Sequence, residues 1–370
     1  MISYDQFGPE YLLKVYDPQL KMQGFLAIDN TWLGPGKGGL RMTASVSEEE
    51  VWRLARTMTW KNALAGIPFG GAKAGIVWPG GSKELKKKFI SAFVSKIKPF
   101  IPKIYVSGPD VGTGEEEMRW FAEVSGKWQS ATGKPADLCV VKRNKRWCGL
   151  PHELGSTGFG VAQATEVAAR LAGINLKKAT VAIHGFGNVG SFTYRYLREM
   201  GARVIAIADL SASLFSEEGF DDSLIEEIVR KRGNLSDYPS AEKLRPADFW
   251  QIKADILIPA SVTDVINQSN KDKIRAKLIV EAANIPMPEE IEEELFGRGI
   301  LIVPDLIANT GGVISSYAEF RGYEPERAFL IIKRKIRSRV RQVLEESLKT
   351  RTNPRTIALN LAQKILLAKR

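Results

Sequence analysis

The spacing of hydrophobic and polar residues predicts helices and strands that alternate along most of the chain. We predict amphipathic helices where apolar residues recur every three or four positions, at 48–65, 83–98, 115–125, 157–171, 188–200 and twice within 325–370. We predict strands where short apolar runs end in polar turn residues, at 76–78, 104–106, 181–183, 204–208, 254–259, 277–283 and 300–303. Strands and helices in alternation indicate an α/β fold.

Residues 180–209 contain the full sequence context of a dinucleotide-binding turn. An apolar strand runs into Gly185-Phe186-Gly187-Asn188-Val189-Gly190, a helix follows, and a second strand ends on Asp209. Gly185 permits a tight turn, Gly187 lets the backbone approach a pyrophosphate, and Gly190 lets the helix pack on the strand. The phosphates would lie at the helix N-terminus, and Asp209 would accept hydrogen bonds from a ribose diol. We predict a nicotinamide or flavin dinucleotide site, with a ligand-free glycine turn as the alternative.

Length and composition indicate a globular protein of two domains. A chain of 370 residues is long for one hydrophobic core, and about 180 residues precede the glycine turn, so the dinucleotide-binding domain comes second. No apolar run reaches membrane-spanning length. Because the N-terminus lacks the basic and apolar regions of a signal peptide, we expect a cytoplasmic protein and no membrane partner.

Few residues are available for metal or redox chemistry. Cys139 and Cys148 suit neither a disulfide framework nor a four-ligand metal site, and His152 and His184 are too few to complete a zinc site, so we expect no metal. His184 ends a buried strand, which favours a packed core residue over a catalyst. The net charge of +11 would suit nucleic acid, small anions or a solvated surface. The basic helical face at 333–341 favours solvent or a subunit interface, and we expect no nucleic-acid partner.

Two lysines in the first part of the chain stand where an anion could meet them. Lys37 lies within GPGKGGLR, which is typical of a shaped loop. Ser47 and Glu50 predict a capping box for the helix at 48–65. Lys61 lies at the edge of the apolar stripe of that helix, where an anion would offset the cost of burying the ammonium. A lysine that extends to solvent is the alternative.

Lys73 and Asp110 are candidates for acid–base chemistry. Lys73 lies among the small residues of GGAKAG, a predicted glycine loop, and burial near other lysines would lower its pKa toward that of a general base. A purely structural glycine turn is the alternative. Asp110 follows the strand at 104–106, where it could meet a substrate or only stabilise its turn.

Several later residues stand at strand ends, where ligands of open parallel sheets bind. Ser261, Asn284 and Asn309 follow three of the predicted strands and would suit a nicotinamide or ribose. Residues 136–150 contain a basic run between the two cysteines, and we expect an irregular, exposed loop there.

GPGKGGLRM, MTWKNALAGIPFGGAKAG, SGPDVGTG, the dinucleotide turn, EAAN and NTGGVISS follow one another in this order. Over roughly residues 25–320 the chain resembles the glutamate/leucine/phenylalanine/valine dehydrogenase family, most closely its glutamate dehydrogenases. The resemblance implies two α/β domains with the active site in the cleft between them. Residues 1–155 would form the substrate-binding and catalytic domain, to which the helices at 325–370 return, and residues 156–324 the Rossmann-type domain. It also implies reversible oxidative deamination of L-glutamate to 2-oxoglutarate and ammonium by a homo-hexamer.

The resemblance also assigns roles to individual residues. It implies that Lys73 is the catalytic lysine and that Asp110 moves the proton at the substrate nitrogen. Lys61 would hold the α-carboxylate, while Lys37 and Ser316 would hold the side-chain carboxylate. The cofactor contacts that it implies are Thr157, Asn188, Val189, Asp209, Asn284 and Asn309.

Three features depart from the family pattern. The N-terminal segment is shorter, Ala74 replaces a glycine after Lys73, and CGLPHELGSTG, which contains Thr157, replaces GGSxGRxEATG. Because no basic residue closely follows Asp209, NAD is favoured, with NADP as the alternative. Two other functions stay open. One is a dehydrogenase for leucine, phenylalanine or valine, and the other is a non-catalytic NAD-binding regulator or nucleic-acid binder.

Overall fold

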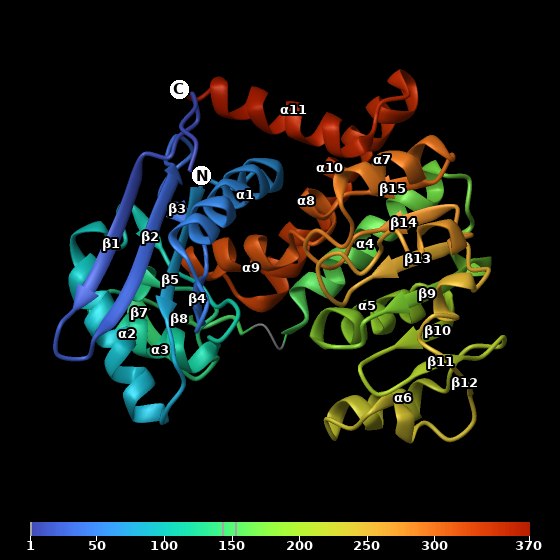
Figure 1. Ribbon diagram of the computed structural model, residues 1–370, viewed down its shortest axis with the longest axis horizontal. Coiled ribbons are helices and arrows are strands. Elements are labelled where there is room, and N and C mark those ends of the chain that lie inside the picture. Colours follow the sequence, from blue (N-terminus) through green and yellow to red (C-terminus); the bar gives the residue numbers. More distant parts are fainter. Residues whose placement is uncertain (1, 143, 152–153) are drawn as a thin grey trace. The chain divides into compact units, whose positions relative to one another are not determined.

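The computed structural model describes residues 2–142, 144–151 and 154–370. It divides into two compact units, and the predicted α/β class is confirmed (Figure 1). Unit 1 consists of Met1–Leu154, Gly312–Ile331 and Leu359–Arg370, and unit 2 of Gly155–Gly311 and Ile332–Ala358. Both predicted C-terminal helices, α10 (Pro325–Thr350) and α11 (Pro354–Leu367), contribute residues to each unit. His152 lies outside the described residues.

Unit 1 is built on a six-stranded mixed sheet. The strand order is β1-β2-β5-β3-β6, with β4 also paired to β5, and the strands are β1 (Tyr11–Asp17), β2 (Met22–Asn30), β3 (Gly36–Lys37), β4 (Leu40–Thr43), β5 (Gly70–Val77) and β6 (Tyr105–Val106). β5 runs antiparallel to β2 and parallel to β3 and β4. It is therefore the central strand, and it carries Lys73.

Alternation along β2 and β5 assigns each side chain to one face of this sheet. Phe25 and Ala27 of β2 pack in one cluster with residues of α1 (Glu48–Ala65). On the other face, Leu26 of β2 and Ala72 of β5 share a core with α2 (Lys83–Ile97) and α3 (Glu115–Ser125). Because Ala72 and its alternate neighbours face α2, Lys73 lies on the α1 side of the sheet.

The glycine-rich segment around Lys73 is a strand, β5, so the prediction of a loop there was wrong. Lys37 lies in the two-residue strand β3, and the residues on either side of this strand form the predicted loop. The cause of the difference at β5 is close packing. A Cβ on Gly71 would lie 2.0 Å from Oγ1 of Thr59 on α1, and one on Gly70 would lie 1.8 Å from the carbonyl oxygen of Asn30 on β2. Glycine at these positions lets a helix and a neighbouring strand approach β5, which is a different requirement from turning the chain.

The predicted helices of unit 1 are confirmed, but one capping interaction differs. The side chain of Ser47 accepts a hydrogen bond from the backbone N–H of Glu50, which is half of the predicted capping box. The carboxylate of Glu50 binds Arg41 on β4 instead of returning to the N-cap. A charged partner across the fold competes with the local capping bond, and local sequence rules do not include such partners.

Two short strands pair within the region that was predicted to be an irregular loop, which corrects this prediction. β7 (Cys139–Lys142) pairs antiparallel with β8 (Lys145–Cys148), and Cys139 is opposite Cys148 in the register. The two cysteines form a disulfide, against the expectation that they have no such role. The ring of Trp147 lies against Gly322 so closely that a Cβ on this glycine would be 2.1 Å from the indole. This contact attaches the strand pair to the turn between α9 (Gly311–Phe320) and α10.

Unit 2 is built on a seven-stranded sheet of order β12-β11-β10-β9-β13-β14-β15. Its strands are β9 (Thr180–His184), β10 (Arg203–Ala208), β11 (Ser213–Phe215), β12 (Glu242–Leu244), β13 (Ile256–Pro259), β14 (Leu278–Val280) and β15 (Leu301–Val303). β9, β10, β13, β14 and β15 are parallel. From β9 the chain continues to β10 on one side and returns to β13 on the other, so the strand order reverses between β9 and β13. Such a reversal is the ligand-binding position of open α/β sheets.

Five helices accompany this sheet: α4 (Ser156–Leu171), α5 (Asn188–Glu199), α6 (Asp222–Arg230), α7 (Glu289–Gly297) and α8 (Asp305–Ala308). α5 follows β9 after the glycine turn, and α4 packs on α5 and β14. Gly201 follows α5 in the left-handed conformation, with φ 88°, which is common for a glycine after a helix.

A buried ion pair joins two segments of unit 1 that are far apart in the sequence. Nζ of Lys134 lies 2.5 Å from Oε1 of Glu319 on α9, and neither side chain has any exposed area. The ammonium also lies 4.0 Å from the centre of the Trp128 ring, and the carboxylate accepts the backbone N–H of Gly133 at 2.6 Å. Because water reaches neither group, each charge is stabilised mainly by the opposite charge of its partner.

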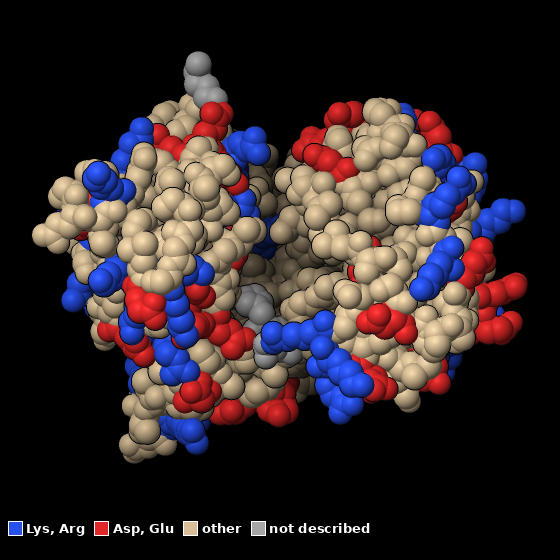
Figure 2. Space-filling model, turned by 60° about the horizontal axis from the view of Figure 1, so that its bottom comes forward, with Lys and Arg blue, Asp and Glu red and all other residues tan. Residues whose placement is uncertain are grey.

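The surface carries both signs of charge. On the face shown in Figure 2, acidic side chains are interspersed among the basic ones over most of the area, as is usual for a solvated surface. Among the described residues, none of the helices combines the length and apolar character needed to cross a lipid bilayer.

We predict that Lys134→Met lowers the free energy of unfolding of unit 1 by about 3–5 kcal/mol, because it leaves the Glu319 carboxylate buried without its cation. The measurement is the thermal unfolding midpoint by calorimetry. Lys83→Met is the matched control, since Lys83 and Glu116 form an exposed pair that should contribute less than about 1 kcal/mol. The double variant Lys134→Met/Glu319→Leu should recover part of the loss. Equal effects of Lys134→Met and Lys83→Met would contradict the prediction.

Candidate active site

Lys73 and Asp110 form a buried ion pair at the centre of unit 1. Nζ of Lys73 on β5 lies 2.6 Å from Oδ2 of Asp110, and the two side chains are only 8% and 16% exposed. Asp110 stands in the turn after β6, and Thr113 fixes this turn by accepting the backbone N–H of Asp110 and donating to the carbonyl of Leu40. The structure thus brings together the two residues that the sequence singled out for acid–base chemistry.

The surroundings set the charge of this pair. Burial lowers the pKa of Lys73, Asp110 opposes this effect, and the cations of Arg41 and Lys61 add to it. Burial would raise the pKa of Asp110, but Lys73 and Arg41 hold it below its ordinary value. The pair therefore combines an ionised carboxylate with a lysine that loses its proton more easily than usual, which suits a general base.

Two further buried lysines lie in the same electrostatic neighbourhood. Lys37 and Lys61 are 4% and 5% exposed. Burial, followed by the ammonium of Lys73, lowers the pKa of Lys37 to about 7. A Cβ on Gly108 would lie 2.4 Å from Nζ of Lys37, so the glycine of SGPDVG leaves room for this ammonium. Three buried lysines around one carboxylate could hold a ligand with more than one negative charge.

α9 supplies the last residue predicted for the substrate site. Ser316 on α9 is buried, and Glu319 lies one turn further along this helix. Glu319 raises the pKa of Lys37 against the effect of burial, which connects α9 electrostatically to Lys37. The ring of Phe320 packs edge-on against Phe69, with 5.1 Å between ring centres, just before β5. These contacts hold the Ser316 helix against the strand that carries Lys73.

The sequence reading missed Arg41, which contacts Asp110 directly. Nε of Arg41 donates to Oδ2 of Asp110 at 3.1 Å, and Arg41 also binds Glu50. It also missed Lys134 and Glu319. GPGKGGLRM contains Arg41, but sequence spacing gave no sign that an arginine on β4 faces a turn 69 residues later.

The predicted dinucleotide turn has the geometry that a pyrophosphate site requires. Gly185 follows β9 with φ 104°, a conformation that side chains other than glycine rarely adopt. A Cβ on Gly190 would lie 1.9 Å from the carbonyl oxygen of Gly185, so only glycine allows α5 to begin this close to the strand. Gly187, the N-cap of α5, has open space beside it, and Asn188 and Val189 form the first helical positions. The N-terminus of α5, where a helix favours negative charge, therefore begins on an unobstructed backbone at the switch point.

Asp209 follows β10 directly, close to the predicted strand end, but its carboxylate also holds the local chain. Oδ1 accepts hydrogen bonds from the backbone N–H and hydroxyl of Ser211 and from the N–H of Ala212, and Oδ2 accepts the N–H of Leu235 at 3.0 Å. Although burial opposes it, these bonds lower the pKa of Asp209. A carboxylate has about four acceptor positions, so Oδ2 keeps capacity for a ribose hydroxyl, whereas Oδ1 is fully used.

The predicted amides meet beyond the carboxyl ends of β14 and β15. Nδ2 of Asn309 donates to Oδ1 of Asn284 at 3.0 Å. Asp305, at the start of α8, accepts the N–H of Ile285 and binds Arg355 at 3.0 Å, and Arg355 also binds Glu281 at 2.6 Å. This buried charge cluster holds the Asn284 segment in place.

Two other residues near the switch point lie where the sequence placed them. Thr157 lies in the first turn of α4, next to the backbone of Gly311. His184 stacks on Trp250 with 4.5 Å between ring centres, and Nδ1 of His184 lies 2.9 Å from the hydroxyl of Ser261. Burial lowers the pKa of His184 to about 4, which confirms a neutral, packed side chain.

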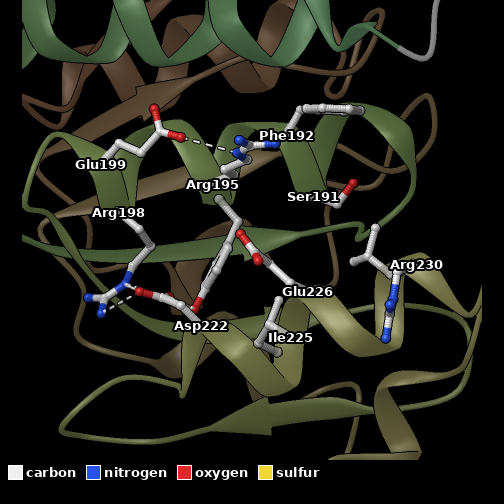
Figure 3. A pocket seen from close by; sticks show the side chains of 11 residues that line it. Ser191, Phe192, Arg195, Arg198, Glu199, Asp222, Ile225, Glu226 and Arg230 are labelled. Atoms are coloured by element: carbon white, nitrogen blue, oxygen red, sulfur yellow. Dashed lines mark hydrogen bonds and ion pairs between the residues drawn. The ribbon is translucent and has the colours of Figure 1, made fainter.

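A separate hollow of about 510 Å³ lies between α5 and α6 (Figure 3). Arg195 pairs with Glu199, and Arg198 with Asp222, beside the apolar side chains of Phe192 and Ile225. The lining contains none of the residues predicted for cofactor or substrate. We therefore assign the candidate site to the residues described above.

A glycine turn at the switch point of a parallel sheet, together with a buried lysine–aspartate pair, is typical of a dinucleotide-dependent oxidoreductase. The chain belongs to the glutamate/leucine/phenylalanine/valine dehydrogenase family. The model of this family matches residues 149–367, and the model described as its dimerisation domain matches residues 13–126.

Individual relatives agree with this assignment. The NADP-specific glutamate dehydrogenase of Saccharolobus shibatae is 38% identical over 82% of this chain and 72% of its own. The NAD-specific glutamate dehydrogenase of Clostridioides difficile is 34% identical over 83% of this chain and 75% of its own. Among solved structures, the hetero-hexameric glutamate dehydrogenase of Thermus thermophilus aligns with a TM-score of 0.84 and 26% identity, covering 98% of this chain and 89% of the other.

We predict that Gly190→Ala weakens NAD binding by at least roughly tenfold, because its Cβ would collide with the carbonyl of Gly185 and displace the start of α5. The measurement is a calorimetric titration of the protein with NAD. Gly297→Ala is the control, since a Cβ there meets nothing within 4 Å and should leave the affinity unchanged. Wild-type affinity in Gly190→Ala would show that the turn does not hold the pyrophosphate.

Proposed function

We propose that this protein catalyses the reversible NAD(P)-dependent oxidative deamination of L-glutamate to 2-oxoglutarate and ammonium. The observation that carries the proposal is the buried Lys73–Asp110 pair with two further lysines beside it. L-Glutamate has two carboxylates, and two lysines besides the catalytic one would balance them. The relatives named as glutamate dehydrogenases support the same substrate.

The chemistry requires a group that is a base when neutral and stabilises an oxygen when charged. The nicotinamide, when bound, supplies the acceptor for the hydride that leaves the substrate Cα. Neutral Lys73 then removes a proton from the water that attacks the imine carbon, and the resulting ammonium stabilises the oxygen bound there. Asp110 relays a proton to the substrate nitrogen, which leaves as ammonia. The 2.6 Å contact lets the two groups exchange a proton directly.

Substrate selection follows from the other buried cations. Lys61 would bind the α-carboxylate from the end of α1, and Lys37 would bind the side-chain carboxylate with Ser316. An enzyme for leucine, phenylalanine or valine would lose stability by burying Lys37 beside an apolar side chain, because the ammonium would lack an anion. The charged site therefore favours glutamate over the apolar amino acids.

The cofactor is proposed to be NAD, with NADP as the alternative. Thr157, the turn from Gly185 to Gly190, Asp209, Asn284 and Asn309 would contact it. The substrate-binding part would comprise residues 1–155 and the C-terminal helices, and the Rossmann part residues 156–324. We also propose a cytoplasmic homo-hexamer. The Thermus thermophilus structure, which is described as a hetero-hexamer, supports an assembly of six subunits.

The first test is formation of NADH or NADPH at 340 nm with glutamate, leucine, phenylalanine and valine. We expect turnover with glutamate, and we expect Lys73→Met and Asp110→Asn each to lower kcat by roughly 10²–10⁴-fold, the usual contribution of a positioned acid or base. NAD affinity should persist in both variants, because the cofactor residues belong to unit 2.

Two outcomes would overturn the proposal. Turnover of only an apolar amino acid would mean that Lys37 has been misread. NAD binding without turnover of any amino acid, together with salt-sensitive retardation of nucleic acid in a gel, would favour the non-catalytic regulator.

A second prediction concerns Lys37. Because its pKa is about 7, Lys37 is charged below this pH and neutral above it, so the glutamate KM should rise as the pH increases through 7. Lys37→Leu should lower kcat/KM for glutamate roughly 10- to 100-fold, the loss of one charge-assisted hydrogen bond, and abolish this rise in KM. The kcat/KM for norvaline, an amino acid that lacks the second carboxylate, should change little in Lys37→Leu. Lys88→Leu on the exposed side of α2 is the control.

A further inference from the structure

Arg41 holds the carboxylate of Asp110 in one orientation. Its Nε donates to Oδ2 at 3.1 Å and its Nη2 lies 3.4 Å from Oδ1, so the guanidinium addresses both oxygens. Lys73 binds Oδ2 as well, at 2.6 Å. Oδ2 thus has two close cationic donors, whereas Oδ1 has one long contact. Oδ1 is therefore the oxygen with capacity left to exchange a proton with the reacting nitrogen.

Backbone hydrogen bonds also fix the position of Arg41 relative to the Asp110 turn. Its neighbours in β4 bind the Asp110 turn on both sides: the N–H of Leu40 donates to Gly108 and the N–H of Met42 donates to Val111. The third guanidinium nitrogen, Nη1, donates to Oε1 of Glu50 in the first turn of α1. Arg41 therefore joins β4, the Asp110 turn and α1, and its side chain is only 19% exposed.

We propose that Arg41 is the positioning residue of the proton relay: it directs Oδ1 of Asp110 toward the substrate nitrogen and, with Glu50, sets the charge balance of the Lys73–Asp110 pair. The proposal rests on the catalytic roles proposed above for Lys73 and Asp110. It assigns to Arg41 no contact with the substrate. Its role is exerted through Asp110, and Glu50 is the counter-charge that limits the field of Arg41.

The charges around the pair predict the direction in which the pKa values of Lys73 and Asp110 change when Arg41 or Glu50 is replaced. Lys73 of β5 faces Asp110, Arg41 of β4 and Lys61 of α1, and Lys37 of β3 and Tyr105 of β6 also interact electrostatically with the pair. The fixed charge of Arg41 lowers the pKa of both Lys73 and Asp110. Removing Arg41 should raise both pKa values. Removing the charge of Glu50 should strengthen the field of Arg41 and lower them.

The experiment compares Arg41→Met, Arg41→Lys and Glu50→Gln with the wild type. The acid limb of the kcat/KM profile for glutamate reports loss of the proton from Lys73 in the free enzyme. We expect this limb to move to higher pH in Arg41→Met, by about one unit. It should move to lower pH by a smaller amount in Glu50→Gln. Arg41→Lys should return the limb toward its wild-type position but leave kcat low, because lysine restores the charge and not the two-pronged contact.

A second measurement follows the protonation of Lys73 and does not depend on turnover. The rate at which cyanate carbamylates Lys73, read by peptide mass spectrometry over a range of pH, reports the fraction of neutral amine. Its midpoint should shift in the same two directions. Arg53→Met and Glu48→Gln are matched controls, because both residues lie on α1 outside the site and Glu48 pairs with Lys14 on the surface. Neither control should move the limb or the midpoint.

The outcomes separate the two levels of proposal. Shifts of opposite sign in Arg41→Met and Glu50→Gln support the role of Arg41, since a simple loss of fold would not shift a midpoint in two directions. Coincident midpoints, or shifts of one sign, would overturn it. A different outcome would be that Lys73→Met keeps full activity while the carbamylation midpoint of Lys73 still shifts in Arg41→Met and Glu50→Gln. In that case the proposed catalytic roles fail and only the electrostatic coupling stands.

Discussion

The interaction on which the proposed active site depends is the buried contact between Lys73 and Asp110. An ammonium on the central strand of a sheet is costly to bury, and the 2.6 Å contact with a carboxylate offsets part of that cost. Two more lysines and Arg41 lie around the same carboxylate, so this part of unit 1 has an excess of positive charge. An anionic substrate would balance that excess. Stability and substrate affinity are thus connected, because the charges that weaken the empty site attract its ligand.

The surrounding structure stabilises these buried charges by supplying counter-charges at fixed positions. Glu50 binds Arg41 from α1, and Glu319 binds Lys134 from α9. In unit 2 the same principle appears with the signs reversed, because Arg355 holds Glu281, Glu292 and Asp305 together below the paired amides of Asn284 and Asn309. In both units a buried ion cluster holds in place the segment that carries the candidate site residues.

Glycine has two different roles in this chain, and only one of them could be predicted. The turn from Gly185 to Gly190 follows a known spacing between two apolar strands, and the structure has the predicted form. Gly70 and Gly71 were expected to form a loop, yet they lie in a strand that must admit α1 and β2 at very short distances. Local sequence reports where the chain can turn. It does not predict which other segment packs against a glycine, because that depends on residues distant in the sequence, such as Thr59 and Asn30.

The sequence by itself determined most of the helices, the parallel strands of unit 2, the dinucleotide turn, and the lysines and aspartate to examine, because short-range periodicity and local motifs carry that information. The helices Glu48–Ala65 and Glu115–Ser125 have the predicted bounds for this reason. The sequence did not predict the strands β1, β2 and β4 of unit 1. The tertiary structure alone decided that Glu50 binds Arg41 instead of closing its capping box, that Cys139 meets Cys148 across two paired strands, and that Arg41 faces Asp110. These contacts join residues through the fold, so their energies depend on distances that local sequence patterns do not contain.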